Sequence, residues 1–168
     1  YKRQTTSACN SECRPVLSSL LNFLVDPAFN SAFNSLLNSE FNHEDEDTDI
    51  YQIWIMPRSK GIVPRWDTAE FPATPAHDAL ALLVSGDDNA PLSINQDARI
   101  YAGRMQADTA LTHHISGQAY LLVSDGAVQV DGTLATKGDG IAISDQPSVT
   151  LSADAACEVL IIEVPGRI

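Results

Sequence analysis

Apolar and polar residues alternate in short runs over most of the chain after residue 50, and turn-forming residues separate the runs. The densest example is Ala119–Asp145, in which Tyr120 and Leu122 alternate with their neighbours before the chain reaches Asp131-Gly132. That dipeptide readily adopts the positive φ angles of a two-residue hairpin turn. Short alternating strands joined by such turns predict a β-meander within a closed barrel or sandwich.

The same alternation predicts eight further strands. They are expected at Ile50–Met56, Ile62–Trp66, Ala79–Val84, Leu92–Asn95, Ala98–Met105, Ala110–Ile115, Val149–Ala153 and Glu158–Val164. The predicted fold class is therefore all-β. Residues 50–164 are expected to form one antiparallel barrel with little helix and no parallel strands.

The first 37 residues have a helical pattern instead. Pro15 suits a first helical turn, and leucines at 17, 20, 21 and 24 follow with helical spacing. A second apolar stripe runs from Phe29 to Leu37. Three interpretations stay open for this segment: a local packing helix with few long-range contacts, a partner-binding hairpin, or an artefactual, misframed tail.

Charge and cysteine content narrow the functional classes. The 22 acidic and 10 basic residues give a net charge of −12, which repels phosphate backbones and anionic lipids. Nucleic acid and membrane partners are therefore not expected. The three cysteines form neither a paired framework nor a zinc motif, and no apolar run approaches the ~20 residues that span a bilayer. We expect a cytoplasmic protein with reduced thiols.

Candidate chemical groups are few. The acidic run Glu44–Asp47 is interpreted as a solvated loop, because adjacent carboxylates diverge rather than converge on a cation. His113 and His114 are adjacent on a predicted strand, so only one can face the barrel interior. His43 and His77 lie in polar, loop-like stretches.

Nucleophilic catalysis also lacks a motif, since no Gly-x-Ser-x-Gly elbow is present and Cys157 precedes an apolar strand where it is expected to be buried. Trp54 and Trp66 are expected in the core, with a barrel mouth as the alternative. No catalytic or cofactor-binding residue is predicted.

An ordered series of motifs resembles the second half of the pirin family, which includes bacterial quercetin 2,3-dioxygenase-like proteins with two cupin barrels. The motifs are Tyr51-Gln-Ile-Trp-Ile-Met-Pro57, Lys60-Gly61-Ile-Val-Pro64, Ile94-Asn-Gln-Asp-Ala98 and Gly138-Asp139-Gly140-Ile-Ala-Ile-Ser-Asp145. The resemblance runs from about Ser39 to Pro165. It implies a carboxy-terminal cupin, a double-stranded β-helix, that packs against an amino-terminal cupin.

The resemblance also implies a divalent metal, iron or similar, held by three histidines and one glutamate of the amino-terminal cupin. A His-Pro-His segment carries two of these ligands in the family, and this sequence has no such segment. The family's His-x-Glu pair corresponds here to Asn38-Ser39-Glu40, which keeps the glutamate alone. Glu40 is therefore interpreted as a remnant metal ligand, and no metal is expected in this chain because one carboxylate is too few donors.

A general cupin site within the second barrel would need a His-x-His segment, a later glutamate and a last histidine. His113 and His114 lie near the first position, but Ala119 occupies the position expected for the glutamate. Serine, valine and threonine at 148–150 occupy the region of the last histidine. We expect one lining histidine and one surface histidine instead.

These observations divide the chain into an atypical segment at 1–37, an acidic linker with a first-cupin remnant at 38–49, and a carboxy-terminal cupin barrel at 50–168. Two functions stay open. The first is a fragment of a dioxygenase acting on flavonol-type aromatics, whose partners are the amino-terminal cupin and a small aromatic ligand. The second is a non-catalytic cupin used for packing, homodimerisation or regulatory interaction. Whether this chain is an enzyme is left undecided.

Overall fold

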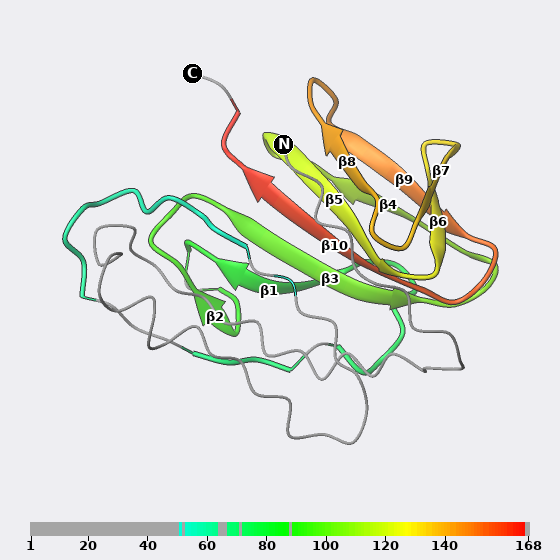
Figure 1. Cartoon of the computed structure of the whole chain (residues 1–168), viewed down its shortest axis with the longest axis horizontal. Helices are drawn as coiled ribbons and strands as arrows, with labels where there is room; N and C mark the ends of the chain where they lie inside the picture. Colours follow the sequence, from blue (N-terminus) through cyan, green and yellow to red (C-terminus); the bar gives the residue numbers. More distant parts are fainter. Residues whose placement is uncertain (1–50, 52, 64–66, 71, 88, 167–168) are drawn as a thin grey trace.

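The structure is a computed structural model that describes residues 51, 53–63, 67–70, 72–87 and 89–166. The described residues form ten strands (Figure 1). These are β1 (Ala81–Ser85), β2 (Leu92–Ser93), β3 (Arg99–Met105), β4 (Thr109–His114), β5 (Gln118–Asp125), β6 (Ala127–Val130), β7 (Thr133–Thr136), β8 (Gly140–Ile143), β9 (Ser148–Ala153) and β10 (Cys157–Val164). The prediction of an all-β cupin-type fold is confirmed.

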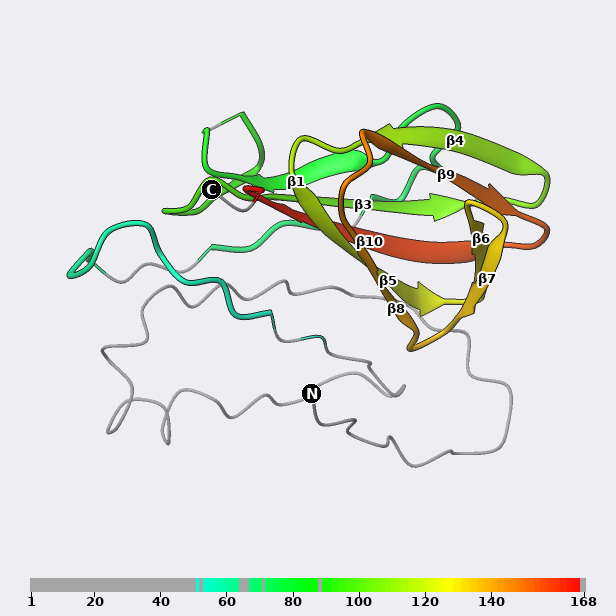
Figure 2. The same ribbon diagram turned by 90° about the horizontal axis from the view of Figure 1, so that it is seen from above.

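The strands divide between two sheets that curve around a common interior (Figure 2). The six-stranded sheet has the order β2-β1-β3-β10-β5-β8, and the four-stranded sheet has the order β4-β9-β6-β7. Strand β10 lies between β3 and β5 and pairs antiparallel with both. The last strand of the chain is thus central, and its alternate residues face either the interior or the outer side of the sheet.

The β-meander expected at Ala119–Asp145 is wrong in its connectivity. Strands β5 and β6 are consecutive in sequence but belong to different sheets, since β5 pairs with β8 and β10 while β6 pairs with β7 and β9. The turn at Gly126 therefore moves the chain from one sheet to the other. Only β6 and β7 form the predicted hairpin, whose turn residues Asp131 and Gly132 have φ angles of 48° and 78°. Alternation predicted the strands, but it carries no information on which strands are neighbours.

All pairings among the described strands are antiparallel except one. Strands β1 and β2 pair in parallel through Val84↔Leu92 and Ser85↔Ser93. The expectation of no parallel strands is wrong at this point. Both Val84 and Leu92 are buried in the same apolar cluster, and the backbone N–H of Ile94 donates to the Ser85 carbonyl at 3.1 Å. Packing and this hydrogen bond hold the two-residue strand in place.

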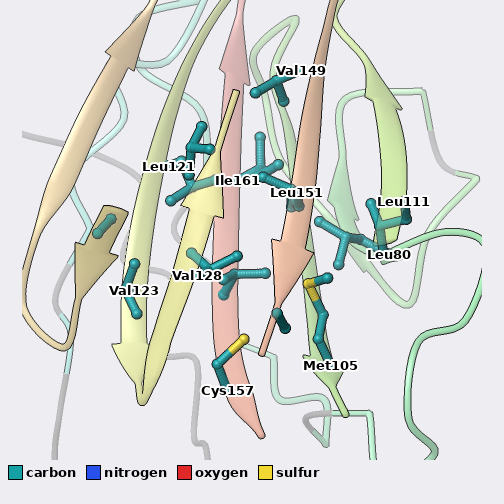
Figure 3. Packing of buried hydrophobic residues seen from close by; sticks show 14 of the residues in the cluster. Leu80, Met105, Leu111, Leu121, Val123, Val128, Val149, Leu151, Cys157 and Ile161 are labelled. Atoms are coloured by element: carbon teal, nitrogen blue, oxygen red, sulfur yellow. The ribbon is translucent and has the colours of Figure 1, made fainter. Parts of the chain in front are cut away.

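The space between the two sheets is filled by apolar side chains (Figure 3). Met105, Leu121, Leu151 and Ile161 come from both sheets and are essentially inaccessible to solvent. Figure 3 shows Leu121, Leu151 and Ile161 near one another between the strands, and Met105 further along the barrel. The barrel interior is therefore a packed core over most of its length.

A second apolar cluster covers the outer side of the six-stranded sheet. Its buried members include Leu92, Ile100 and Leu160, and half-buried Ile53 and Ile55 pack against it. The strand predicted at Ile50–Met56 is wrong, because the described residues 51 and 53–56 are not in a strand. Ile53 and Ile55 nevertheless face the protein, whereas Trp54 and Met56 are exposed.

Side chains and a neighbouring loop hold this segment instead of a sheet ladder. The Gln96 side-chain amide donates to the Met56 carbonyl at 2.7 Å, and the Arg58 N–H donates to the Asn95 carbonyl at 2.6 Å. Trp54 is 52% exposed, so its expected core position is wrong. Ile62 and Val63 are also outside any strand, and the rest of the strand predicted at Ile62–Trp66 lies outside the described residues.

The remaining strand predictions are confirmed within a few residues by β1, β2, β3, β4, β9 and β10. Residues 1–50 and Trp66 lie outside the described residues, so the helical and linker predictions stay untested. No helix in the described part of the chain is long and apolar enough to cross a membrane.

Cys157 begins β10 and is buried in the core between the sheets, as predicted. Burial, with the nearby charge of Asp125 as a smaller cause, raises the pKa of the Cys157 thiol to about 11. The folded state therefore disfavours the thiolate.

Because the pKa is raised on folding, the buried thiol should contribute stability that is complete below the ordinary cysteine pKa and is lost as the pH rises to about 11. We expect a loss of about 3 kcal/mol from this group between pH 8 and pH 11.5. Urea unfolding of the wild type and of Cys157→Ala at both pH values measures this loss of stability. The two proteins share all other titrating groups, so the difference between their losses comes from the Cys157 thiol. Equal losses in the two proteins would contradict the assignment.

Candidate functional site: a buried polar cluster at one end of the barrel

Three strands contribute polar side chains to the interior at one end of the barrel. His113 lies on β4 and Glu163 on β10, and their residues are only 8% and 3% exposed. Tyr101 on β3 packs against the interior core. Glu163 faces inward because it is in phase with Val159 and Ile161, which are core residues of the same strand.

The cluster is joined by a hydrogen bond and a ring contact. Nε2 of His113 lies 2.8 Å from Oε1 of Glu163, and the Tyr101 and His113 rings meet edge to face with centroids 4.6 Å apart. The Ser116 N–H donates to Oε2 of Glu163 at 3.4 Å. Glu163 thereby links β10 to both β4 and the β4–β5 turn, and so joins the two sheets.

The burial and charge of the cluster change the pKa of Tyr101. Burial raises the pKa of the Tyr101 phenol, and the charge of Glu163 raises it further, while Arg99 opposes the shift. A phenol in this position stays protonated through the neutral range. The cluster thus presents an imidazole, a carboxyl and a neutral phenol.

The two adjacent histidines separate as predicted. His113 is buried inside the barrel, and His114 is exposed on the outside. His77 is also exposed, in a bend. Glu40 and His43 lie outside the described residues, so the interpretation of Glu40 as a remnant ligand stays untested.

Glu163 was missed by the sequence reasoning, although its phase within β10 could have revealed it. The cupin pattern called for a carboxylate at position 119, where this chain has alanine. In the structure, Glu163 on β10 is the direct cross-strand partner of Ala119 on β5. A carboxyl group therefore does face the interior at this level, from the neighbouring strand.

The family's metal ligand set does not fit the described cluster. A transition metal site needs three or four convergent donors, and His113 and Glu163 supply two that already contact each other. Within the ranges that the structure describes, no group of three or more His, Cys, Asp and Glu side chains could hold a metal ion. The arrangement fits a hydrogen-bonded strut between the sheets better than a metal centre.

Comparisons with known proteins agree with this architecture. Residues 82–164 match the family described as "Quercetinase C-terminal cupin domain". A Pseudomonas aeruginosa protein with the provisional name quercetin 2,3-dioxygenase is 36% identical over 72% of this chain and 54% of its own length. The Escherichia coli K12 protein named quercetin 2,3-dioxygenase is 32% identical over 71% of this chain and 52% of its own length.

Among solved structures, YhhW from Escherichia coli has a TM-score of 0.63 and 33% identity over 70% of this chain and 50% of that chain. A second structure describes YhhW as a bacterial pirin in complex with nickel(II), with a TM-score of 0.60. The present chain spans about half the length of the curated relatives that it matches.

Proposed function

Because this chain belongs to the pirin family through its quercetinase carboxy-terminal cupin domain at residues 82–164, we propose that it serves as the metal-free half of a two-barrel protein. The preceding barrel would hold a divalent metal ion. The whole protein would oxidise flavonol-type aromatics with dioxygen, and the ion would supply the site at which the substrate's oxygen atoms are anchored.

The observation that carries this proposal is the packed interior of the barrel. Met105, Leu121, Leu151 and Ile161 fill the space between the sheets, and the polar cluster described at one end of it is bonded within itself. A filled barrel supplies surface and rigidity rather than a chamber for a substrate. The names of the relatives supply the chemistry proposed for the whole protein.

The non-catalytic alternative, in which the chain is a dimerising or regulatory module, shares the packed interior. The two functions differ in whether a preceding barrel adds a metal ion and catalytic activity. Cytoplasmic location, a small aromatic ligand and partnership with an amino-terminal cupin likewise stay predictions.

The proposal is tested by incubating the purified chain with nickel(II), iron(II) or manganese(II), dialysing it, and following quercetin loss with oxygen uptake. YhhW loaded in the same way is the reference. We expect no ring opening by the present chain, because its described interior offers two donors where a metal site needs three or four. Metal-dependent turnover by this chain would overturn the proposed division of labour.

A further inference from the structure

Two buried polar atoms lie on the outer side of the six-stranded sheet. Among the described residues, Ser124 Oγ and Glu158 Oε2 are the buried side-chain atoms without a hydrogen-bond partner. Ser124 is fully buried and Glu158 is 7% exposed. Native proteins satisfy nearly all such atoms, because a buried unpaired polar group is costly.

A β-bulge brings these two side chains to the same place. Glu158 on β10 pairs with Asp125, and the next pair is Val159↔Val123, so Ser124 is the extra residue of β5. Val123 and Val159 face the interior core, which places Ser124 and Glu158 on the opposite side of the sheet. Both atoms belong to one polar spot beside the outer apolar cluster, which we call the bulge site.

The described charged side chains around the bulge site form two ion pairs. Nε of Arg104 donates to Oε1 of Glu158 at 2.7 Å, and Nζ of Lys137 lies 3.9 Å from Oδ1 of Asp125. Glu158 Oε2 needs a donor, and the Ser124 hydroxyl can both donate and accept. A neutral group that donates and accepts, a hydroxyl or a carboxamide, satisfies both atoms without disturbing these ion pairs.

The burial of Glu158 also indicates that its carboxyl needs a further hydrogen-bond donor. It raises the pKa of the Glu158 carboxyl, an effect that Arg104 opposes. A further hydrogen bond to Oε2 would favour the charged form and offset that cost.

The entry of the chain into the domain indicates where the donor comes from. The Tyr51 hydroxyl donates to the Ser124 carbonyl at 3.5 Å, so the Tyr51 side chain reaches the bulge site. The matched relatives are about twice as long as the matching region, which is their carboxy-terminal cupin. A barrel that precedes this domain would therefore connect to it beside Ser124 and Glu158.

We propose that the bulge site is the polar anchor for the preceding barrel, which inserts a serine, threonine, tyrosine, asparagine or glutamine side chain between Ser124 and Glu158. The inference rests on the proposed function, because it requires a preceding barrel. Beyond the proposed function, the inference names Ser124 and Glu158 as residues that hold the two barrels together. It also names a hydroxyl or carboxamide as the group that they bind.

The test uses the full chain and the separately produced amino-terminal half of YhhW, which is loaded with nickel(II) to show that it is folded. Binding of the two is measured by titration calorimetry for the wild type, Ser124→Ala and Glu158→Gln. Ser144→Ala and Glu70→Gln are the matched controls, since both residues are exposed. Urea unfolding of each variant without the partner separates an interface role from a structural one.

We expect each bulge-site variant to weaken binding about tenfold or more, the usual effect of losing a buried hydrogen bond. The controls should bind like the wild type, and Ser124→Ala should keep or raise the urea midpoint of the chain alone. Unchanged binding by both variants, or a lowered midpoint for Ser124→Ala, would overturn the inference and leave the proposed function standing. Absence of any binding by the wild type would overturn the proposed function and the inference with it.

Discussion

Replacing Glu163 with alanine is expected to lower the free energy of unfolding by about 3–5 kcal/mol, because it removes one member of a buried, hydrogen-bonded pair. His113 would be left in the core without its partner at 2.8 Å, and the Ser116 N–H would lose its acceptor. The lost bonds connect the two sheets, so the effect should appear in the global unfolding transition. Urea denaturation followed by circular dichroism measures it.

Three further variants serve as controls for Glu163→Ala. Glu163→Gln keeps the size and one acceptor, so it should cost less, about 1–2 kcal/mol. Glu70→Ala, at an exposed position, should stay within about 0.5 kcal/mol. The cycle of Glu163→Ala with His113→Ala should show a coupling of about 1–3 kcal/mol. Additive effects of those two substitutions would contradict a direct pair.

Gly126→Ala should be the second large effect, with a loss of roughly 2–5 kcal/mol from backbone strain and overpacking together. Gly126 has a φ of +71° at the point where the chain leaves β5 for the other sheet. A Cβ atom there would lie 2.5 Å from the Ala156 carbonyl oxygen and 2.9 Å from Cβ of Cys157. The contacted Ala156 carbonyl oxygen belongs to the backbone, so it cannot move aside as easily as the end of a flexible side chain.

Gly132→Ala is the matched control for that prediction. Gly132 has a similar φ of +78°, in the β6–β7 hairpin, but no atom lies within 4 Å of its would-be Cβ. It should cost only the left-handed conformation, about 1 kcal/mol. Thermal unfolding of both variants measures the difference in stability. Equal losses of stability would show that the close approach of Ala156 and Cys157 is not the reason why a glycine is needed at position 126.

Local pattern predicted most of this fold because strand alternation and turn chemistry are local properties. The positive φ angles of Asp131 and Gly132 follow from the dipeptide itself. Which strands pair is decided by long-range packing, so the crossing of the chain between sheets at Gly126 could not be seen in the alternation. Ile53 and Ile55 show the same limit, since their side chains face the protein while their backbone joins no ladder.

The candidate site was predictable in part. The opposite directions of His113 and His114 follow from the strand period, and the structure selects His113 as the buried one. Glu163 shares a face with Val159 and Ile161, so its inward position was implicit in the sequence. Its partnership with His113 was not, because the two residues lie on different sheets and far apart in the chain.

Elemental analysis of the dialysed full chain after incubation with nickel(II), iron(II) or manganese(II) tests the central claim most directly. We expect far less than one metal ion per chain, and no change on Glu40→Gln or Glu163→Gln. Glu70→Gln is the control for a general loss of surface charge. A near-stoichiometric ion that is lost on Glu40→Gln or Glu163→Gln would show that this chain builds a metal site of its own, and would contradict its assignment as the metal-free half.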